Sequence, residues 1–149
     1  MTGTFTFPLL AARVVDGDTI AVTVDQGMHN RWVGELRVQH VDAPEVHSKD
    51  ALEKSAGLSV ASFVQRWLAA QPQGAYDVYS TALDDKFGRL LGDVTRTTIG
   101  ADGTPKLIEG LAGALLKLGC RHYDGEKKQP WTPVELNAIL AAAGGEGRP

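Results

Sequence analysis

The order of apolar and polar residues along the chain predicts strands over its first part. Residues 13–15 and 20–24 are rich in β-branched side chains, which favour strands. Asp16-Gly17 lies between these two runs and is typical of a tight hairpin turn. Residues 25–27 mark a second turn, and residues 32–41 form a third predicted strand. We therefore expect a three-stranded antiparallel meander at the start of the chain.

A helix is predicted after this meander. Asp50-Ala51-Leu52-Glu53 has the pattern of a capping box, and the helix should end before Pro72. The apolar residues recur at helical spacing and form one stripe, made of Ala56, Val60, Phe63, Val64, Trp67 and Leu68. Two further strands are predicted over residues 76–81 and 90–98.

Two more helices are predicted in the C-terminal part. The first ends at Gly119 and carries an apolar stripe of Leu107, Ile108, Leu111, Leu115 and Leu116. The second starts at Thr132-Pro133-Val134-Glu135, which combines a capping box with proline at the first helical position. This element order is α+β and typical of a five-stranded OB-fold barrel with three packed helices. We expect a single domain over residues 1–143 and a flexible tail over residues 144–149.

Composition limits the class of protein and the cell compartment that the sequence predicts. The chain has 149 residues, of which 43% are hydrophobic and 22% charged, as is normal for one soluble domain. Its single cysteine, Cys120, excludes an internal disulfide. No run approaches the roughly 18 apolar residues of a membrane span, and the N-terminus lacks the pattern of a signal peptide. The sequence as written predicts a cytoplasmic monomer, with an origin in a phage or mobile element, or in a trimmed exported precursor, left open.

The charge balance bears on possible nucleic-acid binding. The formal net charge is −3 and the pI about 5.8, whereas nucleic-acid-binding domains are usually basic. Binding is local, however, and carboxylates that hold a divalent cation lower the total charge. The charge therefore predicts weak, salt-sensitive affinity for long DNA, but it does not exclude catalysis at one phosphate.

Three polar clusters lie where predicted strands end. They are residues 16–19 (DGDT), 37–45 (RVQHVDAPE) and 84–89 (DDKFGR). Arg37 lies in a strand that a sheet would half bury, where its guanidinium needs an anion and its planar fork suits a phosphate. Pro44 stiffens the exit from this strand, so the carboxylates on either side of it are held on a short, rigid loop.

The carboxylates of the first two clusters predict a metal site. If the two turns meet, four carboxylates converge, those of Asp16, Asp18, Asp42 and Glu45. Like charges that close must protonate or take up a cation. Oxygen ligands favour calcium or magnesium over zinc.

Arg89, placed by a turn at Gly88, adds a second guanidinium. Two arginines and a metal that face one carboxylate make a site for phosphodiester hydrolysis. The cations stabilise charge on the pentavalent phosphorus, and the carboxylate of Glu45 orients or deprotonates water.

Two other groups of residues in the sequence bear on metal or nucleic-acid binding. The spacing of the four histidines does not predict a metal site; they are His29, His40, His47 and His122. A strip for nucleic acid or a solvated loop, both of which stay open, is formed by Tyr123, Lys127, Lys128 and Trp131.

Taken together, the three clusters resemble the staphylococcal nuclease family. That family is marked by the motifs DGDT, R-x4-D-x-P-E and D-K-[YF]-G-R, and all three occur here in this order. The resemblance runs from about Val14 to Leu118. It implies a five-stranded OB barrel with three helices, and calcium-dependent cleavage of DNA and RNA that leaves 3′-phosphate ends.

The resemblance also implies which residues hold the metal. Asp18 and Asp42 correspond to direct calcium ligands, and Ala43 to a residue that binds through its backbone carbonyl. Asp16 and Thr19 correspond to residues that support the metal loop by hydrogen bonding. The expected cofactor is Ca²⁺, with Mg²⁺ or another divalent ion as the alternative.

By the same resemblance, Arg37 and Arg89 correspond to phosphate clamps and Glu45 to the carboxylate that activates water. Lys86 corresponds to a lysine that contacts a nucleotide's terminal phosphate, and Tyr123 is the candidate aromatic contact to the nucleotide. DNA or RNA is therefore the expected partner.

Other interpretations of these residues stay open. Taken singly, they could be ordinary turn and ion-pair residues: Asp16 and Asp18 in a hairpin, Arg37 with Glu35 or Asp25, Arg89 with Asp84 or Asp85. The whole chain could be a non-catalytic OB-fold module that binds single strands or a protein, or a calcium-binding structural domain. We favour the nuclease, because neither alternative needs two arginines and a water-activating carboxylate beside a metal site.

Overall fold

Five strands close a mixed β-barrel, which confirms the predicted α+β fold of the OB type. The structure, a computed structural model, describes residues 5–82, 87–125 and 127–145. The barrel strands are β1 (Phe5–Asp16), β2 (Thr19–Gly27), β3 (Asn30–Val38), β5 (Tyr76–Ala82) and β6 (Leu90–Ile99). β1, β2 and β3 form the predicted antiparallel meander, and β5 pairs with β1. β6 closes the barrel by pairing antiparallel to β5 and parallel to β3.

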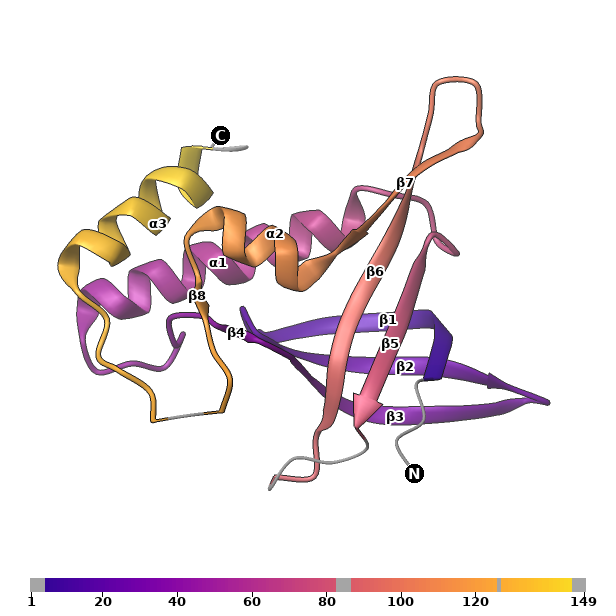
Figure 1. The fold of residues 1–149 in the computed structure, drawn as a ribbon, viewed down its shortest axis with the longest axis horizontal. Coiled ribbons are helices and arrows are strands. Elements are labelled where there is room, and N and C mark those ends of the chain that lie inside the picture. The colour runs from indigo at the N-terminus through magenta and orange to yellow at the C-terminus, as the bar shows by residue number, and fades with distance from the viewer. Residues whose placement is uncertain (1–4, 83–86, 126, 146–149) are drawn as a thin grey trace.

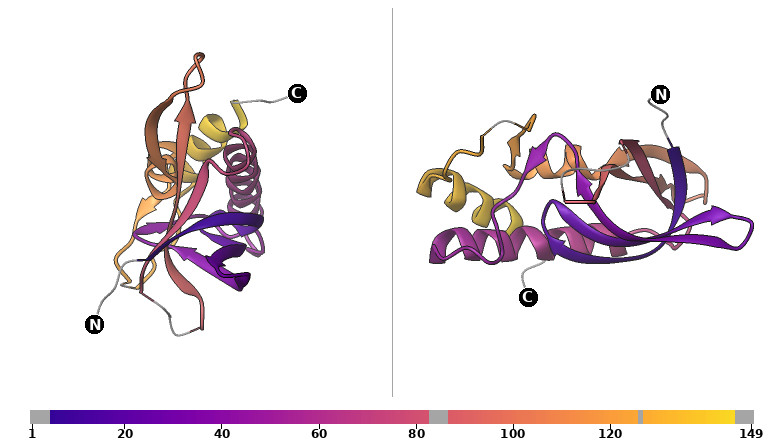
Figure 2. Two further views of the ribbon diagram at one scale, coloured as in Figure 1. Left: turned by 90° about the vertical axis from the view of Figure 1, so that its right-hand side faces the viewer. Right: turned by 90° about the horizontal axis from the view of Figure 1, so that it is seen from below.

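Three helices and three short strands complete the described fold. They are β4 (Val41–Asp42), α1 (Ala51–Ala69), β7 (Pro105–Gly110), α2 (Leu111–Leu118), β8 (Arg121–His122) and α3 (Pro133–Gly145). The helices gather at one side of the barrel, where α1 packs against β1 and α3 (Figures 1 and 2). β4 and β8 pair as a two-stranded ribbon on the helical side of the barrel (Figure 1). No helix in the described part of the chain is long and apolar enough to cross a membrane.

The apolar stripe predicted for the first helix faces the core. Its buried members are Ala56, Val60, Val64 and Trp67, and Phe63 and Leu68 pack partly against them. The inner faces of the barrel strands bury Ile20, Val22, Leu36, Val38, Val78 and Val94. The periodicities of 3.6 and 2 in the sequence thus correspond to one shared core.

The helix predicted from Leu107 is wrong over its first residues. Leu107 and Ile108 pair with β6 as part of β7, and they are 57% and 71% exposed. Because these side chains face solvent, burial does not hold them in a helix, and backbone pairing with β6 decides their conformation. α2 begins at the fully buried Leu111 and ends at Leu118, and the predicted C-cap Gly119 follows with a left-handed φ of 118°.

The third predicted strand is interrupted near its end. β3 ends at Val38, residues 39–40 form a turn, and the chain resumes as β4 at Val41. His40 has a φ of 66°, a left-handed conformation that is uncommon for a non-glycine residue. This turn separates β4 from the barrel and lets it pair with β8.

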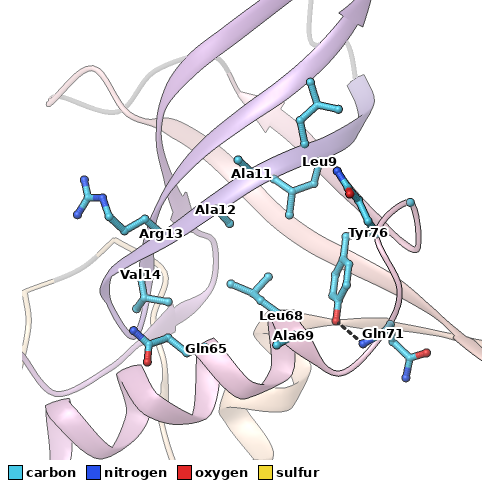
Figure 3. Close-up of a pocket in the computed structure, with 13 residues that line it drawn as sticks. Leu9, Ala11, Ala12, Arg13, Val14, Gln65, Leu68, Ala69, Gln71 and Tyr76 are labelled. Atoms are coloured by element: carbon cyan, nitrogen blue, oxygen red, sulfur yellow. Dashed lines mark hydrogen bonds between the residues drawn. The ribbon is translucent and has the colours of Figure 1, made fainter.

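Tyr76 of β5 fastens the C-terminal end of α1 to the barrel (Figure 3). Its hydroxyl donates a hydrogen bond to the carbonyl of Trp67 at 2.6 Å and accepts one from the main-chain nitrogen of Gln71 at 3.0 Å. Arg96 of β6 donates to the same carbonyl at 2.8 Å and stacks 4.3 Å from the Trp67 ring. Barrel side chains thus satisfy a carbonyl in the last turn of α1.

Two glycines let the loop after β4 lie close to α1. A Cβ atom at Gly57 of α1 would lie 2.7 Å from the carbonyl oxygen of Glu45 and 2.9 Å from that of Pro44. A Cβ atom at Gly17, in the turn between β1 and β2, would lie 2.4 Å from Val60 Cγ1. A side chain at position 57 would push two backbones apart, and one at position 17 would displace the Val60 side chain, so both close contacts depend on glycine.

The start of α2 is capped by a side chain from β6. Its N-cap residue, Gly110, has no side chain, and Asp93 Oδ1 accepts a hydrogen bond from Ala112 N at 3.0 Å. The same oxygen accepts one from Val94 N at 2.9 Å. Burial outweighs these bonds and raises the pKa of Asp93 to about 6.

The capping box predicted at the start of α3 is confirmed. Glu135 N donates to Thr132 Oγ1 at 3.3 Å, and Glu135 Oε1 accepts from Thr132 N at 3.0 Å. Arg121 of β8 donates from Nε to Glu135 Oε2 at 2.7 Å. The hydrogen bond from Arg121 holds the pKa of Glu135 at about 2.

We predict that Gly57→Ala destabilises the protein by about 1–3 kcal/mol, because the new methyl group overpacks against backbone atoms. The predicted value is a net loss, in which the cost of overpacking exceeds the roughly 1 kcal/mol that alanine gains over glycine in a helix. The matched control is Gly113→Ala in α2, where no atom lies within 4 Å of the added Cβ and a small stabilisation is expected. Urea unfolding of both variants measures the difference, and equal effects would contradict the close approach.

We also predict opposite pH dependences for two carboxyl groups. The raised pKa of Asp93 means that the folded protein binds more protons than the unfolded chain between about pH 4 and pH 6. Stability relative to Asp93→Asn should therefore fall as the pH rises through this range. The lowered pKa of Glu135 gives the other sign, so the stability lost in Glu135→Gln is present above about pH 4.5 and fades as the pH falls toward 2. Urea unfolding at several pH values tests both signs.

Candidate active site

The turn between β1 and β2 places Asp18 against the loop that follows β4. Asp18 is buried, and its Oδ2 accepts a hydrogen bond from the main-chain nitrogen of Ala43 at 2.9 Å. Its Oδ1 accepts one from the Thr19 hydroxyl at 3.2 Å, and its carbonyl accepts one from Val38 N at 2.8 Å. The first two polar clusters of the sequence are therefore in direct contact.

Two more carboxylates hold the same loop by its main-chain nitrogens. Asp16 Oδ1 accepts a hydrogen bond from Val46 N at 3.1 Å, and Glu53 Oε2 accepts one from Glu45 N at 3.2 Å. The capping box predicted at Asp50 is wrong in this respect. Asp50 is the N-cap of α1, but Glu53 bonds to the loop.

Arg37, at the end of β3, is 8% exposed, and its guanidinium has partners on two sides. Nη1 donates to the carbonyls of Val38 at 2.6 Å and Val41 at 2.8 Å, which closes the turn between β3 and β4. Nη2 lies 3.6 Å from Asp18 Oδ2 and 4.0 Å from Asp42 Oδ1. The alternative of an ion pair on the surface of β3 is excluded, because the guanidinium is buried and faces these two carboxylates.

Asp42 is a buried carboxylate with an oxygen suited to a cation. Its Oδ1 forms an ion pair with Lys128 Nζ at 3.0 Å. Burial raises the pKa of Asp42, the nearby charge of Asp18 adds to the rise, and Lys128 and Arg37 oppose it. Two acidic and two basic side chains therefore meet here.

This donor set fits a hard divalent cation. Asp18 and Asp42 bring two buried carboxylates together, and Asp42 Oδ1 has no hydrogen-bond partner among the described residues. Carboxylate oxygens are the ligands that calcium and magnesium prefer. Lys128 Nζ already lies against Asp42, so an ion that binds this oxygen has to displace the ammonium group.

The predicted convergence of four carboxylates is wrong. Among the described residues, no three of Asp16, Asp18, Asp42 and Glu45 bring their oxygen atoms within 4.8 Å of one another. The physical reason is hydrogen bonding. Asp16 accepts a hydrogen bond from the main-chain nitrogen of Val46, and Glu45 is exposed in a pocket that Arg37 and Arg89 also line.

The three residues expected to carry out catalysis line one pocket of about 970 Å³. Arg37 comes from β3, Glu45 from the loop after β4, and Arg89 from the segment just before β6. Side chains from the segment after β8 complete the pocket, among them Tyr123, Asp124, Lys127 and Lys128. Residues far apart in the sequence are thus brought to one surface.

Arg89 also contacts the turn that carries Asp18. Its Nη1 donates to Thr19 Oγ1 at 3.4 Å, and its guanidinium lies 5.1 Å from the centre of the Phe87 ring. Lys86 and residues 84–85 lie outside the described residues. The contact expected of Lys86 and the alternative ion pair of Arg89 therefore stay predictions.

Tyr123 forms part of the pocket wall. Its ring centre lies 5.9 Å from the Arg37 guanidinium and 5.7 Å from Lys128 Nζ, distances at which cations and aromatic rings attract. Trp131 is placed differently, because Arg121 stacks 4.3 Å from its ring and it packs partly on the core. Of the aromatic and basic residues after β8, Tyr123, Lys127 and Lys128 therefore line the pocket, and Trp131 packs against the core.

The structure also brings together two histidines whose spacing does not predict a metal site. His40, His122 and Asp124 place one ligand atom each within 4.8 Å of one another. The turn after β3 and the pairing of β4 with β8 create this cluster. Sequence reasoning missed this cluster because finding it requires knowing that β4 pairs with β8, and no sequence pattern indicates that pairing.

A second pocket, of about 430 Å³, lies between β1 and the end of α1 (Figure 3). Its lining is mainly alkyl and amide groups, with Arg13 and Tyr76 as the ionisable members. None of its lining residues is a carboxylate or an imidazole, so the acid–base groups belong to the first pocket.

The chain matches no protein-family model and no curated protein.

We predict that Lys128→Met strengthens calcium binding by about tenfold, because the ion no longer competes with an ammonium group beside Asp42. Lys127→Met is the matched control, since Lys127 lines the same pocket, whereas the described ion pair with Asp42 is made by Lys128. Calorimetric titration with Ca²⁺ measures both affinities. An unchanged or weaker affinity in Lys128→Met would show that the ammonium does not occupy the site.

Proposed function

We propose that the protein is a calcium-dependent nuclease that hydrolyses phosphodiester bonds in DNA or RNA. The observation that carries this proposal is the shared pocket of Arg37, Glu45 and Arg89, beside the buried pair Asp18 and Asp42. Two cations and an exposed carboxylate on one surface are the groups that phosphate hydrolysis requires. The three motifs shared with the staphylococcal nuclease family support the same reaction, its calcium dependence and its 3′-phosphate products.

In this proposal the arginines bind the scissile phosphate. Arg37 is fixed by two main-chain carbonyls and two carboxylates, so its guanidinium is positioned before substrate arrives. Arg89 donates a hydrogen bond to Thr19, the residue next to Asp18. Together they stabilise the negative charge that builds on the phosphoryl oxygens as water adds.

Glu45 takes a proton from the attacking water. Its carboxylate is exposed in the pocket, while Glu53 fixes its main-chain nitrogen. The water oxygen forms a bond to phosphorus as the bond to the 5′-oxygen breaks, and the leaving oxygen takes up a proton. The products are a 3′-phosphate and a 5′-hydroxyl, which balances the addition of one water.

Asp18 and Asp42 would hold the calcium ion, with the backbone carbonyl of Ala43 as a third ligand. When bound, the ion would supply positive charge at the phosphoryl oxygens and increase the acidity of water near it. Lys128, displaced from Asp42, would remain in the pocket to pair with substrate phosphate.

A second candidate is a non-catalytic module that binds single-stranded nucleic acid. The placement of Tyr123 beside Arg37 and Lys128 favours it, because a base can stack on the ring while the cations contact the backbone. The two candidates differ in whether the phosphodiester bond is broken.

We predict calcium-dependent cleavage of single-stranded DNA or RNA, abolished by a chelator. Glu45→Gln should lower the rate by about 100-fold or more, because the group that deprotonates water is lost. Glu35→Gln on the exposed side of β3 is the control and should cleave normally. Gel assays of labelled oligonucleotides measure the rates, with product ends read by phosphatase treatment.

A chain that binds oligonucleotides but does not cleave them with any divalent ion would establish the binding module instead. Equal losses in Glu45→Gln and Glu35→Gln would remove Glu45 from the reaction.

A further inference from the structure

We propose that His40, His122 and Asp124 form a second metal site, which binds a divalent transition ion of the zinc type at the rim of the pocket. This site is distinct in residues and in ligand chemistry from the oxygen ligands Asp18 and Asp42. The proposal goes beyond the nuclease reaction and does not depend on it.

The three side chains lie close enough together to share one ion. Nδ1 of His40 lies 3.6 Å from Asp124 Oδ1, and Nδ1 of His122 lies 3.6 Å from Asp124 Oδ2. Ligands about 2.1 Å from a tetrahedral zinc ion are roughly 3.4 Å apart, so both distances are near this value. The three ligand atoms lie within 4.8 Å, and their side chains are at least 60% exposed, which leaves them free to close around an ion.

The ligand types select the class of metal. Two imidazole nitrogens and one carboxylate suit zinc, copper, nickel or iron, whereas calcium prefers oxygen ligands alone. Three protein ligands leave a position for water, as in open zinc sites.

Backbone pairing holds the ligands in place from both sides. His40 lies in the turn before β4, and its carbonyl accepts a hydrogen bond from Tyr123 N at 3.0 Å. His122 pairs with Val41 across the β4–β8 ribbon. The two imidazole rings are nearly parallel, with an angle of 9° and centres 6.3 Å apart. Only the side chains have to move for an ion to bind.

A bound ion would have a consequence for the pocket. Tyr123 stands between His122 and Asp124 in sequence and lines the pocket near Arg37. An ion shared by residues on both sides of Tyr123 and by the turn after β3 would restrict the position of its ring. Zinc would thus act on the pocket from its rim, apart from the calcium ligands.

The test is calorimetric titration of the metal-free full chain with Zn²⁺, carried out in excess Ca²⁺ so that the oxygen site is filled. We expect one zinc ion per chain. His122→Ala and Asp124→Asn each remove one of the three ligands. Each should weaken zinc binding by more than the roughly 10- to 100-fold that is lost when a residue hydrogen-bonded to a ligand is removed. His47→Ala is the control, since His47 is an exposed histidine outside the cluster and should bind zinc normally.

Titration with Co²⁺ adds a spectroscopic measure, because visible absorption reports the ligands and the coordination number. Circular dichroism of each variant checks that these exposed substitutions leave the fold intact. Absence of saturable zinc binding would overturn the proposal, as would binding that persists unchanged in both His122→Ala and Asp124→Asn.

Discussion

Hydrogen bonds that the main-chain N–H groups of the loop after β4 donate to carboxylates are the interactions on which the candidate site depends. Asp16, Asp18 and Glu53 each accept one of these bonds, and they come from the first hairpin and from α1. Bonds to charged acceptors are stronger than neutral ones, and a buried N–H without a partner is costly. The loop is therefore held at three points, and this determines where Asp42 and Glu45 lie.

The negative charges of the buried Asp18 and Asp42 are compensated by basic side chains beside them. Asp18 and Asp42 are buried near each other, and Arg37 and Lys128 lie within 4.0 Å of them. The net charge of −3 does not reveal this balance, because it sums over the whole chain. Whether a cation binds depends on how readily the Lys128 ammonium leaves, since Arg37 is fixed by main-chain carbonyls.

Much of the fold could be predicted because its signals are local. The meander, the apolar stripe of α1 and the box at Thr132 and Glu135 each depend on residues close in sequence, and the structure confirms them. The failures occurred where a distant partner competed with the local pattern. Leu107 pairs with β6 rather than starting a helix, and Glu53 bonds to the loop at Glu45 rather than to its own helix end.

The sequence by itself determined the five barrel strands, the three helices and the motifs that contain Arg37, Glu45 and Arg89, since periodicity, caps and turns are encoded within a few residues. Only the tertiary structure decided which atoms of these residues meet. The ion pair of Asp42 with Lys128 and the cluster around His122 both follow from the β4–β8 pairing and the segment after it. That pairing joins two-residue strands from distant parts of the chain, and such short strands carry too little periodicity to be recognised beforehand.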